Sequence, residues 1–171
     1  MNAGQSEDGM ELLGTIFLLL HIGGAIVAFG PTFAFPIIGA RAAAEPMHGN
    51  FALRVSEFIS NRVVEPGAVF VFLMGLGLIW TRGWNPFTTL WLAIAIILFL
   101  ITISFAVFVQ APVVKRMIQL TSGPPPAPAD GAPAGPPPEF VALSKRAGRG
   151  GMFSLLMLFT ILFMMVFKPT L

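Results

Sequence analysis

Cysteine is absent from the 171-residue chain, and charged side chains make up only 11% of it. Without cysteine, disulfides, thiolate metal sites, iron–sulfur ligation and thiol nucleophiles are all excluded. Ten Lys and Arg side chains against eight Asp and Glu leave a net charge of +2, too small and too scattered for a nucleic-acid-binding surface. We therefore expect no nucleic-acid partner.

The motifs of soluble enzymes are missing as well. The sequence contains no HExxH, no phosphate-binding glycine loop, no paired carboxylates and no Ser/His/Asp set. No charged residue lies deep within a long apolar segment, which argues against a proton relay or an ion-coupled transporter. We predict no catalytic residue, and the sequence favours a binding or structural role over an enzymatic one.

Apolar side chains are abundant, at 56% of the residues with 17 Phe. Several apolar segments approach or exceed the roughly 20 residues that cross a hydrocarbon layer of about 30 Å. The sequence therefore predicts an all-α polytopic membrane protein, a single membrane domain with four transmembrane helices. These are expected at about 12–40, 66–81, 86–111 and 150–168. Trp80, Trp84 and Trp91 predict an aromatic belt at one membrane interface.

Three further segments have a distinct pattern. An apolar stripe at helical spacing predicts an additional amphipathic helix at 51–65 that lies at the membrane surface, with Asn50 as its N-cap. Pro31 interrupts the first span and predicts a bend, where the Thr32 hydroxyl can satisfy a freed carbonyl. Eight prolines in residues 123–138 predict a flexible, extended linker.

The distribution of cations predicts the orientation. If all four segments cross, eight Lys and Arg side chains lie on one side and two on the other; if the short second segment does not cross, the division is five and five. Because cations accumulate in cytoplasmic loops, four spans with both termini outside the cytoplasm and the linker inside are favoured. The cationic groups at 41–62 and 145–149 could also bind anionic headgroups or an acidic partner, although orientation alone explains them.

His21 is the main functional candidate, because a polar group inside a membrane helix is costly unless it contacts protein, water or a ligand. Its helical neighbours Gly24, Ala25 and Ala28 are small, and such a face admits another helix or a flat cofactor. We predict a cofactor-binding face of His21, Gly24, Ala25 and Ala28, with His21 as a metal ligand. The alternative is a hydrogen bond from His21 across a helix interface to a hydroxyl or carbonyl.

Other polar or soft groups are weaker candidates. His48 lies in the first loop, outside the membrane. Met157 and Met164 share a helix face and could supply thioether ligands to copper or haem, although packing explains them better. Thr102 and Gln110 also share a face and predict hydrogen bonds between helices.

The stretch LHIGGAIVAFGPTFAFPIIGARAA resembles the opening helix of a bacterial family of predicted four-helix integral membrane proteins of unknown function. That family is itself similar to the HemJ-type protoporphyrinogen oxidases and the CopD-type copper-resistance proteins. The shared features are His21, the aromatic–glycine pair at 29–30, and small and basic residues at 39–41. HemJ-type proteins also carry a lysine within a later span, whereas Lys115 lies at a helix end here, so the oxidase activity is not carried over.

The resemblance implies a bacterial inner-membrane location and either haem binding through His21, with haem b as the cofactor, or copper handling. Three hypotheses therefore stay open. The protein binds haem or another porphyrin; it is a structural or accessory subunit that contacts a membrane-protein partner or forms a homo-oligomer; or it handles copper. In each case the protein is embedded in the lipid bilayer.

Overall fold

The computed structural model describes residues 3–123 and 136–169, and over these residues it is helical with no strand. Most of the predicted linker, residues 124–135, lies outside the described residues. The elements in chain order are α1 (Ala3–Phe29), η1 (Gly30–Ala34), α2 (Phe35–Ala44), η2 (Pro46–His48), α3 (Gly49–Ile59), η3 (Ser60–Val64), α4 (Glu65–Arg82), α5 (Leu90–Phe105), η4 (Ala106–Gln110), α6 (Ala111–Thr121) and α7 (Pro138–Phe167).

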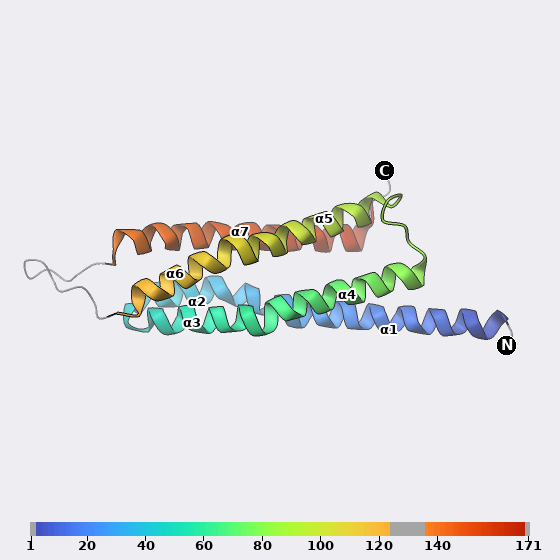
Figure 1. The fold of residues 1–171 in the computed structure, drawn as a ribbon, viewed down its shortest axis with the longest axis horizontal. Coiled ribbons are helices and arrows are strands. Elements are labelled where there is room, and N and C mark those ends of the chain that lie inside the picture. Colours follow the sequence, from blue (N-terminus) through green and yellow to red (C-terminus); the bar gives the residue numbers. More distant parts are fainter. Residues whose placement is uncertain (1–2, 124–135, 170–171) are drawn as a thin grey trace, which may run out of the picture.

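Neighbouring elements run on into four long apolar helices, which confirms the all-α fold with four candidate spans. They cover Glu7–Ala44, Pro46–Arg82, Leu90–Thr121 and Pro138–Phe167, and they contain 30 to 38 residues each. At about 1.5 Å per residue, each is roughly 45–57 Å long, well beyond a hydrocarbon layer of about 30 Å. Figure 1 shows them side by side along the long axis of the molecule, so each helix extends past the membrane.

The predicted surface helix at 51–65 differs from the structure. The stretch is helical, but α3 continues through η3 into α4, and Figure 1 shows α3 in line with α4. It is therefore the projecting end of the second long helix, not a separate element lying across the spans. The physical reason is that α3 packs lengthwise on α2 and α6, although Phe51 and Phe58 of its apolar stripe stay exposed.

Prolines cause the three irregular turns that interrupt the long helices. Pro36, Pro66 and Pro112 each stand second in the regular helix that follows η1, η3 or η4. A proline ring crowds the carbonyl four residues earlier, which falls within the irregular turn in each case. The η1 turn is of the 3₁₀ type and contains Pro31, which confirms the predicted bend, while η3 and η4 are π turns that widen the helix. Thr32 Oγ1 donates to the Phe29 carbonyl at 2.6 Å, as predicted.

These interruptions lie within the length of the bundle, where η3 contacts α1 and η4 contacts α7. They divide it into two parts that we name here. The membrane half consists of α1, α4, α5 and α7 from Gly151 onward. The stalk half consists of α2, α3, α6 and α7 up to Gly150, and it occupies the left-hand part of Figure 1.

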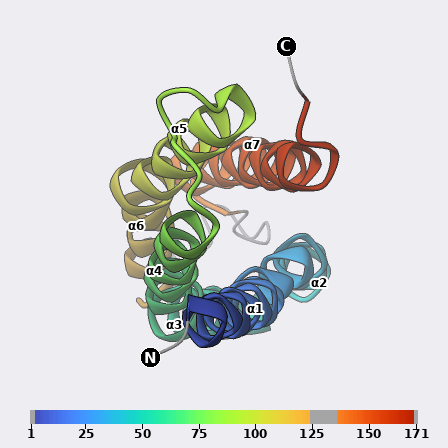
Figure 2. The same cartoon turned by 90° about the vertical axis from the view of Figure 1, so that its right-hand side faces the viewer.

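Two helical hairpins make up the membrane half. The α1–α4 contact is the most extensive in the structure, and α5 packs on α7; the end-on view in Figure 2 shows both pairs. The hairpins meet where Phe72 of α4 stacks on Phe99 of α5, with ring centroids 5.6 Å apart. Among the described residues, the buried core side chains are Ala28, Ala68, Val71, Leu78, Trp91, Leu92, Ala95, Val113 and Met117.

Candidate functional site

The α1–α4 interface is built from small residues that receive larger ones. Five α1 residues contact α4 at alternating spacings of three and four, the pattern of a left-handed helix pair: Gly14, Phe17, His21, Gly24 and Ala28. In α4, a glycine lies against three of them: Gly77 against Phe17, Gly75 against His21 and Gly67 against Ala28. Small residues of this kind let helix backbones approach closely within a membrane.

His21 forms a hydrogen bond across this interface. Its Nδ1 lies 2.8 Å from the carbonyl oxygen of Val71 in α4. Gly75 leaves room for the ring, because a Cβ there would lie 3.2 Å from Cε1 and 3.3 Å from Nδ1 of His21. The contact confirms the interhelical hydrogen bond that the sequence offered as an alternative role for this histidine.

The bond also fixes which ring nitrogen carries the proton. A carbonyl oxygen can only accept, so Nδ1 is the donor and the neutral ring keeps its lone pair on Nε2. Nε2 has no hydrogen-bond partner among the described residues. His21 is half-buried, and over the described part of the chain no buried side-chain nitrogen or oxygen lacks a partner. Nε2 is therefore at least partly exposed.

The small-residue face predicted beside His21 is covered by α4. A Cβ at Gly24 would lie 2.9 Å from the Phe70 ring, and Ala28 is only 1% exposed. Ala25 stays half-buried at the edge of the contact. The face therefore packs against a second helix. Because α4 covers Gly24 and Ala28, a flat ligand that binds Nε2 has to approach from beside α4.

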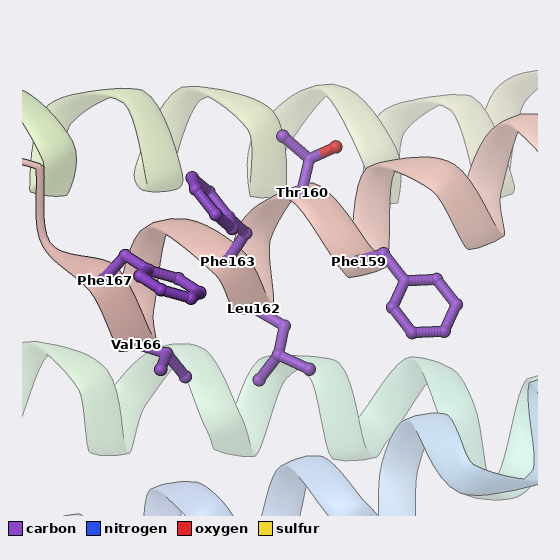
Figure 3. Close-up of a pocket in the computed structure, with 6 residues that line it drawn as sticks. All are labelled: Phe159, Thr160, Leu162, Phe163, Val166 and Phe167. Carbon is purple, nitrogen blue, oxygen red and sulfur yellow. The ribbon is translucent and has the colours of Figure 1, made fainter.

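Two open apolar grooves of similar size lie on the membrane half. One of about 560 Å³ runs between α1 and α4 and reaches the predicted face, because its lining includes Gly24 and Ala28 but not His21. A second hollow, of about 540 Å³, is lined by α7 side chains alone, among them Phe159 and Leu162. Figure 3 shows Leu162 extending from α7 toward the α4 ribbon. Neither cavity has a charged group in its lining.

The other predicted polar contacts divide into one that forms and one that does not. Gln110 Nε2 donates to the Ala147 carbonyl of α7 at 2.8 Å, and the buried Gly150 leaves space for the Gln110 side chain. Thr102 Oγ1 instead donates to the Leu98 carbonyl of its own helix at 2.7 Å, so its predicted contact with another helix is wrong. Within the residues that the structure describes, no three His, Asp or Glu side chains gather as a metal site.

One protein-family model matches most of this chain. A family model described as "Predicted integral membrane protein (DUF2269)" matches residues 15–169, from the first span to the end of the fourth. The chain belongs to this family. The match includes His21 and both halves of the bundle, and the family description agrees with the four apolar helices. The comparisons with curated proteins and with solved structures found no match.

In this family member, Asn50 makes a polar contact that the sequence analysis missed. Its Nδ2 donates to the Ile118 carbonyl at 3.1 Å and to Thr121 Oγ1 at 2.8 Å, while Arg54 Nε donates to Asn50 Oδ1 at 2.8 Å. The Ile118 carbonyl also accepts from Ser122 Oγ at 2.6 Å and from Thr121 Oγ1 at 3.2 Å, so Asn50 adds a donor from a neighbouring helix and joins α3 to the end of α6. The predicted N-cap role is wrong, since His48 holds that position and no side chain caps α3.

The far end of the membrane half carries an aromatic cluster around Lys168. Trp84 and Trp91 pack edge to face with centroids 5.4 Å apart, and Lys168 Nζ lies 5.0 Å and 5.6 Å from their ring centres. Such contacts between a cation and an aromatic face are attractive. Trp91 is 7% exposed and Trp80 is 66% exposed, so only part of the predicted belt faces outward. The cluster fixes the end of α7 to the start of α5.

Proposed function

We propose that this integral membrane protein binds haem, as haem b, or another porphyrin through Nε2 of His21. The hydrogen bond from Nδ1 to the Val71 carbonyl supports the proposal most directly. Histidines that ligate metals usually donate their other ring N–H to a carbonyl or carboxylate, which fixes the tautomer and the ring orientation. A neutral imidazole of this kind is a common ligand of haem iron. The first helix resembles a family that is itself similar to HemJ-type proteins, and this resemblance implies the same ligand.

The residues present fit a single axial ligand. Nε2 is partly exposed and the surrounding α1 and α4 side chains are mostly apolar, which suits a hydrophobic macrocycle. Haem, when bound, would supply iron-centred ligand binding or electron transfer. This chain would supply the imidazole through His21, hold its tautomer through Val71 and leave room for the ring at Gly75.

An absorption titration tests this proposal. The full chain is purified in mild detergent and titrated with haemin, and we expect a shifted Soret band that saturates at one haem per chain. His21→Ala should abolish the shift. His48→Ala is the matched control, because His48 is the second of the two histidines and its side chain is 62% exposed in the stalk half. Absence of any Soret shift, or a shift that survives in His21→Ala, contradicts the proposal.

A second candidate function is that of an accessory subunit, favoured by apolar side chains on the stalk half. Met47 is 87% exposed, Phe51 70% and Phe58 64%. Outside the membrane, a group of exposed large apolar side chains is typical of a surface that binds another protein. On this hypothesis His21→Gln has no effect on assembly. The double substitution Phe51→Ser and Phe58→Ser should remove a copurifying protein or second copy, whereas Phe87→Ser, at the other end, should not.

Copper handling is the third proposal, and it has the least support. His21 is the one histidine within a predicted span. The number and positions of the methionines that could assist it are typical of residues that fill space between helices. Expression in copper-rich medium tests it: copper bound to the purified protein, and lost in His21→Ala, would favour this role over haem.

For orientation, we infer that the stalk half lies in the cytoplasm. Eight of the ten cations belong to the stalk half or to the irregular turns at its border. Positive charge accumulates on the cytoplasmic side of membrane proteins, which supports this orientation. The eight cations are Arg41, Arg54, Arg62, Lys115, Arg116, Lys145, Arg146 and Arg149. Reporter fusions at the two termini test the inference, and both should report a location outside the cytoplasm.

A further inference from the structure

The cationic side chains of the protein fall into two groups. Four have a partner among the described residues: Arg41, Arg54, Arg116 and Lys168. Six have neither an ion pair nor a side-chain hydrogen bond within that part of the chain: Arg62, Arg82, Lys115, Lys145, Arg146 and Arg149. Three of these six cations lie within the five-residue segment 145–149 of α7. No other segment of this length in the described chain contains so many cations without a partner.

These three side chains share one side of α7. Lys145 and Arg149 are four residues apart and Arg146 and Arg149 three apart, so they are neighbours on the helix surface. All three are exposed. The packed side of the helix is a different one, marked by the Gln110 bond to Ala147 and by the buried Gly150. The cations therefore point away from the rest of the bundle.

The backbone beside these cations is uncovered. A Cβ at Gly148 or Gly151 would find no atom within 4 Å, so no neighbouring side chain stands over this part of the helix. The nearest acidic residue along α7, Glu139, is already bound by Arg116 at 2.8 Å. An anion could therefore approach the three cations without displacing a carboxylate of the described chain.

The position of the group along α7 matches a membrane surface. The helix ends at Phe167, directly before Lys168 in its aromatic cluster, which is typical of one interface. Counting back about 20 residues, or roughly 30 Å, reaches the neighbourhood of Gly148. Lys145, Arg146 and Arg149 thus lie at the headgroup level of the opposite leaflet, on the side of the stalk half.

We propose that Lys145, Arg146 and Arg149 form a binding site for the phosphate headgroup of an anionic phospholipid in that leaflet. The guanidinium groups can bind phosphate oxygens in a bidentate manner, and the lysine adds a mobile point charge. Gly148 adds no side chain beside Lys145, and the acyl chains would lie along the apolar part of α7 that begins at Met152, which is 68% exposed. The site is independent of His21, so neither proposal depends on the other.

Lipid retention by the full chain in mild detergent tests the site. Phosphatidylglycerol and phosphatidylcholine with the same acyl chains are added separately, and bound lipid is counted by native mass spectrometry. We expect the protein to bind the anionic lipid at least tenfold more tightly. The triple variant Lys145→Gln, Arg146→Gln and Arg149→Gln should lose this preference, while an excess of inorganic phosphate should not displace the lipid from the unaltered protein.

The control variant removes the same charge elsewhere: Arg62→Gln, Arg82→Gln and Lys115→Gln, the three dispersed cations without partners. It should keep the preference for the anionic lipid. Equal losses in both triple variants would mean that net charge governs binding and would overturn the site. So would the absence of any preference in the unaltered protein, or displacement by inorganic phosphate. Circular dichroism of all three proteins establishes that each is folded when it is measured.

Discussion

The membrane half and the stalk half are formed by the same long helices, but different contacts hold them together. In the membrane half, glycines of α4 receive Phe17 and Ala28 of α1, and the one side-chain hydrogen bond between its helices, within the described chain, is that of His21. In the stalk half, Asn50 and Arg116 form polar contacts with neighbouring helices. Lipid offers no hydrophobic driving force between helices, so close packing dominates where helices are surrounded by lipid.

The stalk half combines apolar packing with polar contacts between its helices. There, amphipathic helices bury one side against each other, and the ends of helices need partners for their free carbonyls. At the end of α6, Thr121, Ser122 and Asn50 all donate to the Ile118 carbonyl, and Val113 and Met117 provide the buried apolar side chains. The change from one regime to the other takes place at the irregular turns, where the long helices are already interrupted by proline.

The largest loss of stability is expected from Gly67→Leu, which prevents the close approach of α1 and α4 in the membrane half. A Cβ at this position would lie 3.2 Å from the Ala28 Cα, a backbone atom, so α1 and α4 would have to separate. Overpacking of this kind costs about 1–3 kcal/mol. Thermal unfolding in detergent, followed by circular dichroism, should show a transition several degrees lower than in the unaltered protein.

The control for this substitution is Gly23→Leu on α1. A Cβ at Gly23 would meet nothing within 4 Å, and leucine is favoured over glycine in a helix by about 0.8–1 kcal/mol. We therefore expect an unchanged or higher unfolding temperature. If both leucine variants unfold at the same temperature, close packing is not what distinguishes the membrane half.

The sequence predicted the membrane half better than the stalk half, for physical reasons. Long apolar segments and Pro31 are local signals, and a lone polar group such as His21 in a span must find a partner, so a hydrogen bond across the helix interface followed from its chemistry. The apolar stripe at 51–65 shows only that the helix has an apolar side. It does not show whether the helix lies across a membrane surface or packs lengthwise on α2 and α6, as it does here with Phe51 and Phe58 exposed.

Nothing in the sequence indicated which distant residue a polar side chain contacts. Asn50 binds the end of α6 from 68 residues away, and nothing near Asn50 in the sequence points to that partner. Thr102 illustrates a competing local contact, because the carbonyl four residues earlier is always within reach of a threonine hydroxyl in a helix. That bond satisfied Thr102 within α5, whereas the longer side chain of Gln110 reached α7.

A smaller effect, confined to the stalk half, is expected from Asn50→Ala. The variant loses the hydrogen bonds to Ile118 and Thr121, each worth about 1 kcal/mol net. Amide hydrogen exchange should accelerate in α6, while exchange in α1 and α4 stays as it is. Asn61→Ala, an exposed amide in η3, is the control and should change neither region. Faster exchange throughout the bundle would show that the two halves are not separate in stability.

The smallest effect should come from the exposed pair between Arg116 and Glu139, which joins α6 to α7. Arg116 Nε donates to Glu139 Oε1 at 2.8 Å and Nη2 to Oε2 at 3.2 Å. This hydrogen bonding, together with the attraction of the charges, lowers the pKa of Glu139 and raises the pKa of Arg116. Both side chains are about half exposed, so water and salt screen the pair and its contribution to stability is small.

The direction of the pH dependence follows from the lowered pKa of Glu139. A carboxylate whose pKa is lower in the folded state stabilises that state at neutral pH, and the contribution disappears as the pH falls from about 4.3, the ordinary glutamate value, through the lowered one. The difference in unfolding temperature between the unaltered protein and Glu139→Gln should therefore shrink between pH 6 and pH 3, or on addition of salt at pH 6. A constant difference would contradict a charge-dependent role. The packing of Gly67 on Ala28 contains no titratable group. The decrease in unfolding temperature caused by Gly67→Leu should therefore be the same from pH 6 to pH 3, in contrast to the effect of Glu139→Gln in the stalk half.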